Sequence, residues 1–87
     1  MTHKIYHEIE SLVNKFNEKN VKHFNAEYAY KITPLGYNEK DDLCGMYITF
    51  YHTFFSTDLD IILELKNKHY LSMMLGNDDG DAFIYLQ

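Results

Sequence analysis

The chain lacks arginine and tryptophan and contains little cysteine, proline and glycine. Its 87 residues include one Cys, one Pro and four Gly, and all eight basic residues are lysines. A single cysteine excludes an internal disulfide framework and a metal site built from several cysteines. Arginine is the usual reader of guanine edges and phosphate groups. Its absence, together with a net charge of −5, argues against direct binding of nucleic acid.

Long apolar runs are also missing. No segment approaches the ~20 consecutive apolar residues of a membrane span, and the first four residues lack the apolar core of a signal peptide. We therefore expect a cytoplasmic protein without a membrane segment. The composition, 46% hydrophobic and 24% charged, is typical of a folded globular protein. The length fits one domain over residues 1–87.

The first segment has the spacing of an amphipathic helix. Its apolar residues recur every three or four positions from Ile5 to Phe16, which is the period of one helix face. Thr2 is a suitable residue to cap the first turn. The pattern predicts a helix over about residues 3–18.

Alternating apolar and polar residues predict strands in the rest of the chain. The longest, at about residues 44–55, has two substantial faces and should be central in a sheet. Further strands are expected at about residues 26–33, 58–66, 69–75 and 82–86. The predicted fold class is α+β, with an N-terminal helix packed on an antiparallel meander sheet of four to five strands in two layers.

Residues 58–75 allow a second interpretation. Thr57 and Asp58 could begin a helix, and Gly76 could end it. Strand register favours two strands instead. Turns at residues 56–57 and 66–68 would put the apolar residues of three consecutive strands on one face, and a slip by one residue would destroy this match.

A meander would gather acidic residues at one end of the sheet, because its alternate turns emerge at the same end. This predicted acidic end consists of Asp58, Asp60, Asp78, Asp79 and Asp81. Repulsion within such a cluster calls for water, an ion or a basic partner, although Asp is also a residue that turns prefer. A calcium loop is the weaker interpretation, because Ala82 stands where that loop needs glycine.

The sheet face turned away from the helix should be rich in aromatic residues. The chain has eight Tyr and six Phe, and one helix cannot cover both faces of a sheet. Tyrosine provides rigid contact area with a polar tip and is typical of recognition surfaces. The aromatic residues expected to contact a partner are Tyr47, Tyr51, Phe55 and Tyr70. Tyr and Thr are also good strand formers, and a homodimer through this face is an alternative.

No arrangement of residues indicates catalysis. His52 falls on the core side of the predicted central strand, and Cys44 stands alone at its start. His3 and His7 have the i, i+4 spacing of metal ligands, but no third ligand is apparent. We therefore expect neither an enzyme nor a bound cofactor or metal.

These features together predict a small acidic protein that binds a basic surface of another protein. Our first hypothesis is an inhibitor encoded by a phage or mobile element. It would block a host enzyme that handles nucleic acid, in the manner of a DNA mimic or an anti-CRISPR protein. The alternatives are an immunity protein that neutralises a toxin, a small metal or ligand sensor, and a subunit of a larger assembly.

Overall fold

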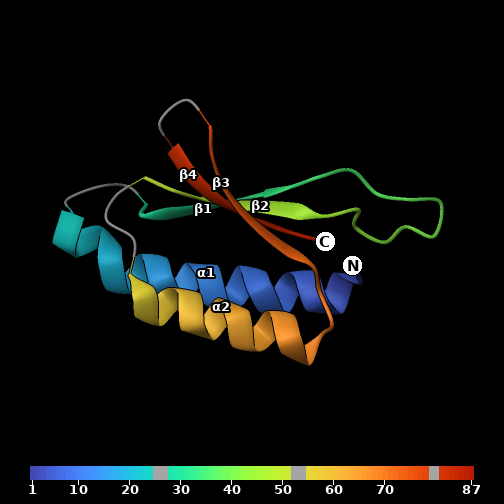
Figure 1. The fold of residues 1–87 in the computed structure, drawn as a ribbon, viewed down its shortest axis with the longest axis horizontal. Coiled ribbons are helices and arrows are strands. Elements are labelled where there is room, and N and C mark those ends of the chain that lie inside the picture. The colour runs from blue at the N-terminus through green and yellow to red at the C-terminus, as the bar shows by residue number, and fades with distance from the viewer. Residues whose placement is uncertain (25–27, 52–54, 79–80) are drawn as a thin grey trace.

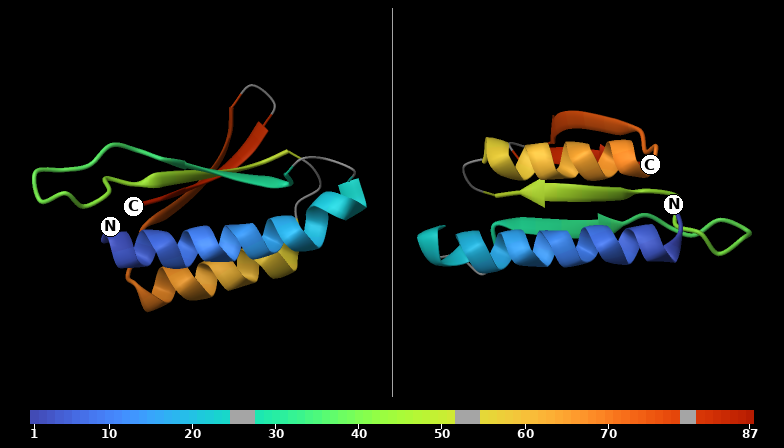
Figure 2. Two further views of the ribbon diagram at one scale, coloured as in Figure 1. Left: turned by 180° about the vertical axis from the view of Figure 1, so that it is seen from behind. Right: turned by 90° about the horizontal axis from the view of Figure 1, so that it is seen from below.

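The fold has two layers, with two helices on one face of an antiparallel sheet. The computed structural model describes residues 1–24, 28–51, 55–78 and 81–87. Within these ranges the elements are α1 (His3–Phe24), β1 (Tyr30–Pro34), β2 (Met46–Phe50), α2 (Ser56–Lys68), β3 (Met73–Asp78) and β4 (Asp81–Leu86). Figures 1 and 2 show α1 and α2 side by side beneath the sheet. The predicted α+β fold in two layers is confirmed.

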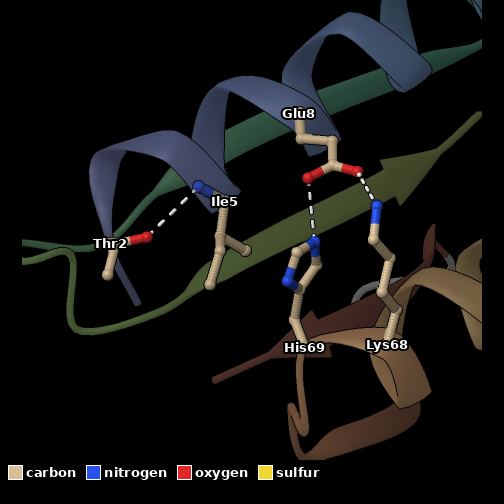
Figure 3. A network of polar contacts seen from close by, with 5 residues as sticks. All are labelled: Thr2, Ile5, Glu8, Lys68 and His69. Atoms are coloured by element: carbon tan, nitrogen blue, oxygen red, sulfur yellow. Dashed lines mark hydrogen bonds and ion pairs between the residues drawn. The ribbon is translucent and has the colours of Figure 1, made fainter.

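The start of α1 is capped as predicted. The Thr2 hydroxyl accepts a hydrogen bond from the Ile5 amide at 3.3 Å (Figure 3), and so satisfies one of the free N–H groups of the first turn. The helix turns Ile9, Val13 and Phe16 inward, and each of them is at most 3% exposed. The apolar stripe seen in the sequence is therefore the core face of the helix.

The end of α1 lies beyond the predicted position. The predicted helix ended near residue 18. Asn17 and Asn20 lie at this point, and Asn disfavours a helix interior because it competes with the helix backbone for hydrogen bonds. Both side chains instead bond to other elements. The Asn17 amide contacts the backbone of Tyr30, and the Asn20 amide contacts the carboxylate of Asp58. Both asparagines therefore lie within the helix, which continues to Phe24.

Residues 58–66, predicted as a strand, lie in α2. The helix buries Asp58 and Ile62, which are 0% and 1% exposed, one turn apart on the same side. Leu and Ile occupy so many positions between residues 58 and 66 that the apolar spacing of this segment fits both a strand and a helix. The alternative of a helix over residues 58–75 is closer to the structure, although α2 ends at Lys68.

The end of α2 is a Schellman motif. The Leu71 amide donates to the Lys66 carbonyl at 2.9 Å, and the Tyr70 amide donates to the Asn67 carbonyl at 3.3 Å. Tyr70 takes the left-handed position of this motif, with a φ of 55°. Glycine is the usual residue at that position because it has no Cβ, so Gly76 was the wrong residue to mark the helix end.

The strands are shifted and reordered relative to the prediction. The strands predicted at residues 26–33, 44–55, 69–75 and 82–86 correspond to β1, β2, β3 and β4, with different bounds. Residues 52–54 lie outside the described residues. The spatial order is β1-β2-β4-β3, so the sheet is not a meander. Its order changes because α2 carries the chain from β2 to the far edge, and β4 then returns between β2 and β3.

The hydrophobic core lies between the sheet and the two helices. The even-numbered residues Met46 and Ile48 of β2 are 0% exposed, as is Ile84 of β4, the register partner of Ile48. The even face of the central strand was predicted to meet the helix, and it does. Among the described residues, neither helix combines the length and apolar character needed to cross a membrane.

A polar contact joins the beginning of α1 to the end of α2. Glu8 lies 3.1 Å from Nζ of Lys68 and 2.8 Å from Nε2 of His69 (Figure 3). The hydrogen bonds from Lys68 and from His69 hold the pKa of Glu8 below its usual range. This contact helps to keep the two helices side by side.

Candidate functional site

The candidate functional site is the sheet face that the helices leave uncovered. Neighbouring residues in the register of a sheet point to the same side. Thr33 pairs with Tyr47, Tyr47 with Tyr85, and Thr49 with Phe83. We call this surface the open face. Its residues are Lys31, Thr33, Tyr47, Thr49, Tyr51, Met74, Phe83 and Tyr85.

A hollow of about 440 Å³ lies on the open face. It is lined by Thr33, Tyr47, Thr49, Tyr51, Asn77, Asp81 and Phe83. In Figure 1, the end at which β3 finishes and β4 begins rises away from the helices. The lining residues come from β1, from β2 with the residue after it, and from this raised end, so the twist of the sheet makes the open face concave.

Aromatic rings cover one part of the open face. The Tyr47 ring meets the Phe83 ring edge-on at 5.3 Å between centroids, and it is tilted against the Tyr85 ring at 5.1 Å. The Phe83 ring also lies over Gly76, where an added Cβ would come within 2.6 Å of its Cζ atom. These contacts hold the rings in place before any partner binds, which lowers the entropic cost of binding.

A second aromatic pair lies at the edge of the hollow. Tyr51 is 39% exposed, and its ring lies 5.3 Å from the ring of Tyr28. The ammonium of Lys31 lies 6.0 Å from the centroid of the Tyr28 ring, a distance at which a cation is attracted to the ring face. Tyr51 therefore presents a supported aromatic surface to the solvent.

The members of the predicted acidic end that the structure describes lie on different elements. Asp81 is exposed and lines the hollow, and Asp78 holds the register position opposite Asp81. Asp60 is exposed on α2, and this helix lies beneath the sheet in Figure 1. Asp79 lies outside the described residues. The gathering depended on a turn at residues 56–58, and these residues belong to α2 instead.

Asp58 is a buried structural residue, so its predicted role as a partner contact is corrected. It is 0% exposed. Its carboxylate accepts hydrogen bonds from the Tyr30 hydroxyl at 2.6 Å and the Asn20 amide at 3.2 Å, and Lys19 Nζ lies 3.4 Å away. Burial, and then the bond to Asp58, raise the pKa of Tyr30 above its usual range. The sequence gives no sign of this network, because its members lie 28 and 38 residues from Asp58.

Phe55 and Tyr70 lie outside the hollow. Phe55 immediately precedes α2, and the ammonium of Lys19 lies 6.0 Å from its ring centroid. Tyr70 follows α2 and is 96% exposed. Of the predicted aromatic contact residues, the structure therefore brings Tyr47 and Tyr51 together with Asp81 in one hollow.

The histidines and the cysteine do not form a reactive group in the described part of the chain. His3 Nε2 lies 2.7 Å from the Asp41 carbonyl oxygen, whereas His7 Nδ1 lies 3.4 Å from Glu10. Among the residues whose side chains the structure describes, no three His, Cys, Asp or Glu come close enough to hold a metal ion. Cys44 is an exposed free thiol, and His52 lies outside the described residues.

Comparison of the chain with protein-family models, with curated proteins and with solved structures finds no match. The functional argument therefore rests on the chemistry of the open face.

Proposed function

We propose that the protein is an inhibitor that places its open face on a basic surface of another protein, and that the partner is an enzyme that handles nucleic acid. The observation that supports this proposal is the hollow, in which Tyr47, Tyr51 and Phe83 lie with the carboxylate of Asp81. Aromatic anchors surrounded by a few polar groups are the composition of an interface centre.

The aromatic residues supply the contact area in this proposal. Tyr and Phe each bury a large rigid surface on binding, and the hydroxyls of Thr33 and Thr49 add hydrogen-bonding groups in the same hollow. Because Asp58 is buried and Asp60 lies on α2, affinity depends on these rings more than on a row of carboxylates spaced like phosphates. The proposal is therefore one of surface competition rather than of close imitation of DNA.

In this proposal, the charge of the protein determines which partner surfaces it binds. The net charge of −5 attracts basic surfaces and speeds association with them at low salt. Asp81 adds a carboxylate at the hollow for a lysine or arginine of the partner. Enzymes that hold nucleic acid expose such lysine and arginine surfaces, and a protein seated there excludes the nucleic acid.

The test compares four immobilised versions of the protein in bacterial lysate. Wild type should recover a basic, nucleic-acid-binding protein that elutes as salt rises through roughly 0.1–0.5 M, where exposed charges become screened. Tyr51→Ala should recover much less of it. Asp81→Asn should recover it with elution at lower salt, whereas Asp60→Asn, the same change on α2, should behave as wild type.

Two results would contradict the proposal. One is equal recovery by Tyr51→Ala and wild type, which would move binding away from the open face. The other is a recovered partner that is acidic or has no role with nucleic acid.

A small-molecule ligand is the second candidate, because the volume of the hollow falls within the roughly 300–1,000 Å³ of ligand pockets. Native mass spectrometry distinguishes it, since a bound ligand adds a small mass to the 10.4 kDa chain.

A further inference from the structure

The two edge strands of the sheet use their outward backbone groups differently. At the β1 edge, the side chain of Asn17 bonds to both the N–H and the C=O of Tyr30, at 2.7 and 2.8 Å. Pro34, at the end of the same strand, has no N–H to offer. These two features block β1 against pairing with another strand.

The β3 edge has no such protection in the described part of the chain. Ser72 and Gln87 exchange two hydrogen bonds, at 3.0 and 3.1 Å. Given the β3–β4 register, alternate residues therefore bond to β4, and the N–H and C=O groups of Met73, Leu75 and Asn77 point away from it. No described residue bonds to these outward groups, and β3 contains neither lysine nor proline.

The side chains at this edge are apolar on both faces. Met74, on the open face, is 56% exposed, and Leu75, on the helix face, is 54% exposed. An edge strand that exposes apolar side chains and unpaired backbone groups is a template for a further strand.

We propose that two copies of this chain pair antiparallel along β3, about a two-fold axis at Leu75. Leu75 then lies opposite Leu75 of the second copy, and Met73 lies opposite Asn77. Every outward N–H and C=O of these three residues gains a hydrogen-bond partner in both copies. The two sheets become one continuous sheet.

The side chains support a second copy as the occupant. In this register, Met74 lies opposite Gly76 of the second copy, so a long side chain meets a position that has none. It also comes next to the Phe83 ring that lies over Gly76, and a methionine sulfur near an aromatic ring is a favourable contact. On the helix face, the two exposed Leu75 side chains cover each other.

The positions of the acidic residues favour the antiparallel arrangement. It puts Asp78 in register with Ser72 of the second copy, so the two Asp78 positions lie at opposite ends of the seam. Parallel pairing would set Asp78 against Asp78, and like charges directly opposite are destabilising. An antiparallel register centred on Met73 or Asn77 would leave outward groups unpaired.

The paired sheet would present both open faces on the same side. Two binding surfaces held together bind a partner with matching sites more tightly than one surface does. The dimer proposal does not rest on the proposed function, because it is argued from the outward backbone groups of β3 and not from the hollow. Separate variants test the two proposals.

Sedimentation equilibrium tests the proposal. The mass of wild type should rise from 10.4 kDa toward twice that value between roughly 1 µM and 1 mM, a range suited to an interface of small area. Leu75→Lys places two like charges opposite each other and should weaken the dimer about tenfold or more. Ile61→Lys, a similar exchange at a residue 41% exposed on α2, should leave it unchanged. Far-UV circular dichroism of each variant should match wild type.

A cysteine scan tests the register. In a Cys44→Ser background, Leu75→Cys should form a disulfide-linked dimer on oxidation, because facing Cα atoms lie about 5.5 Å apart. Met73→Cys, which faces Asn77 of the second copy, should not. A mass of 10.4 kDa at every concentration, a dimer unaffected by Leu75→Lys, or equal cross-linking by Met73→Cys would overturn the proposal.

Discussion

Replacement of Asp58 by alanine should be the most destabilising single change in the Asp58 network. The carboxylate is 0% exposed and accepts hydrogen bonds from the Tyr30 hydroxyl and the Asn20 amide. The alanine variant loses both bonds and leaves two donors unpaired in the interior. We expect the free energy of unfolding to fall by about 3–5 kcal/mol, because each of the two lost hydrogen bonds to a charged group is worth about 1.5–3 kcal/mol.

The individual contributions support this magnitude. A hydrogen bond to a charged group is worth about 1.5–3 kcal/mol, and the 2.6 Å bond from Tyr30 is the shorter of the two. The ion pair with Lys19 adds little, about 0–1 kcal/mol, because the Lys19 side chain is 59% exposed. A domain of this size has a total stability of only about 5–10 kcal/mol, so the variant should lose a large share of it.

Urea denaturation followed by far-UV circular dichroism measures the effect. Tyr30→Phe should cost about 1.5–3 kcal/mol, because it removes one charged hydrogen bond and keeps the ring. Asp60→Ala, two residues along α2 and exposed, should change stability by less than about 0.5 kcal/mol. An Asp58→Ala variant within about 1 kcal/mol of wild type would refute the reasoning.

Three further predictions concern other positions. Glu8→Gln should destabilise the protein at pH 7 but much less at pH 3. The pKa of Glu8 is lowered in the folded protein, and the stability that this provides is lost as pH falls through that pKa. A difference in urea midpoint between the variant and wild type that is constant with pH would contradict this. Gly76→Ala should lower the free energy of unfolding by about 1 kcal/mol, because the new Cβ displaces the Phe83 ring. In other strand positions, Gly→Ala stabilises a protein. A gain in the thermal midpoint of this variant would therefore contradict the prediction and show that the ring moves freely. Tyr70→Gly should raise the free energy of unfolding by about 1 kcal/mol, because it removes the cost of the left-handed conformation; no rise in the urea midpoint would count against a strained Tyr70.

Local patterns were sufficient for several elements. The apolar stripe of residues 5–16 and the Thr2 cap predicted α1, and the two alternating faces of residues 46–51 predicted both the core side and the open side of β2. These predictions were correct because each depends on the spacing of apolar residues within one element. Residues 5–16 fit only the helix period, and residues 46–51 fit only the strand period.

The remaining errors came from segments that local patterns could not decide. In α2, Leu and Ile occupy positions that satisfy both the strand and the helix period, and the choice depends on packing of Ile62 and on partners for Asp58. The wrong choice then gave a meander and the acidic end. Asp58 itself was placed on the surface because a buried carboxylate is recognised only by partners that lie far away in the sequence.

The affinity of variants for the partner recovered from lysate tests the central claim most directly. Tyr51 on the open face and Ile61 on the helix side are 39% and 41% exposed, so their alanine variants remove similarly exposed side chains from opposite layers. The account predicts that Tyr51→Ala raises Kd about tenfold or more, as for an interface anchor, whereas Ile61→Ala leaves Kd within about twofold of wild type. An unchanged Kd for Tyr51→Ala together with a large rise for Ile61→Ala would contradict it, because binding would then occur on the helices.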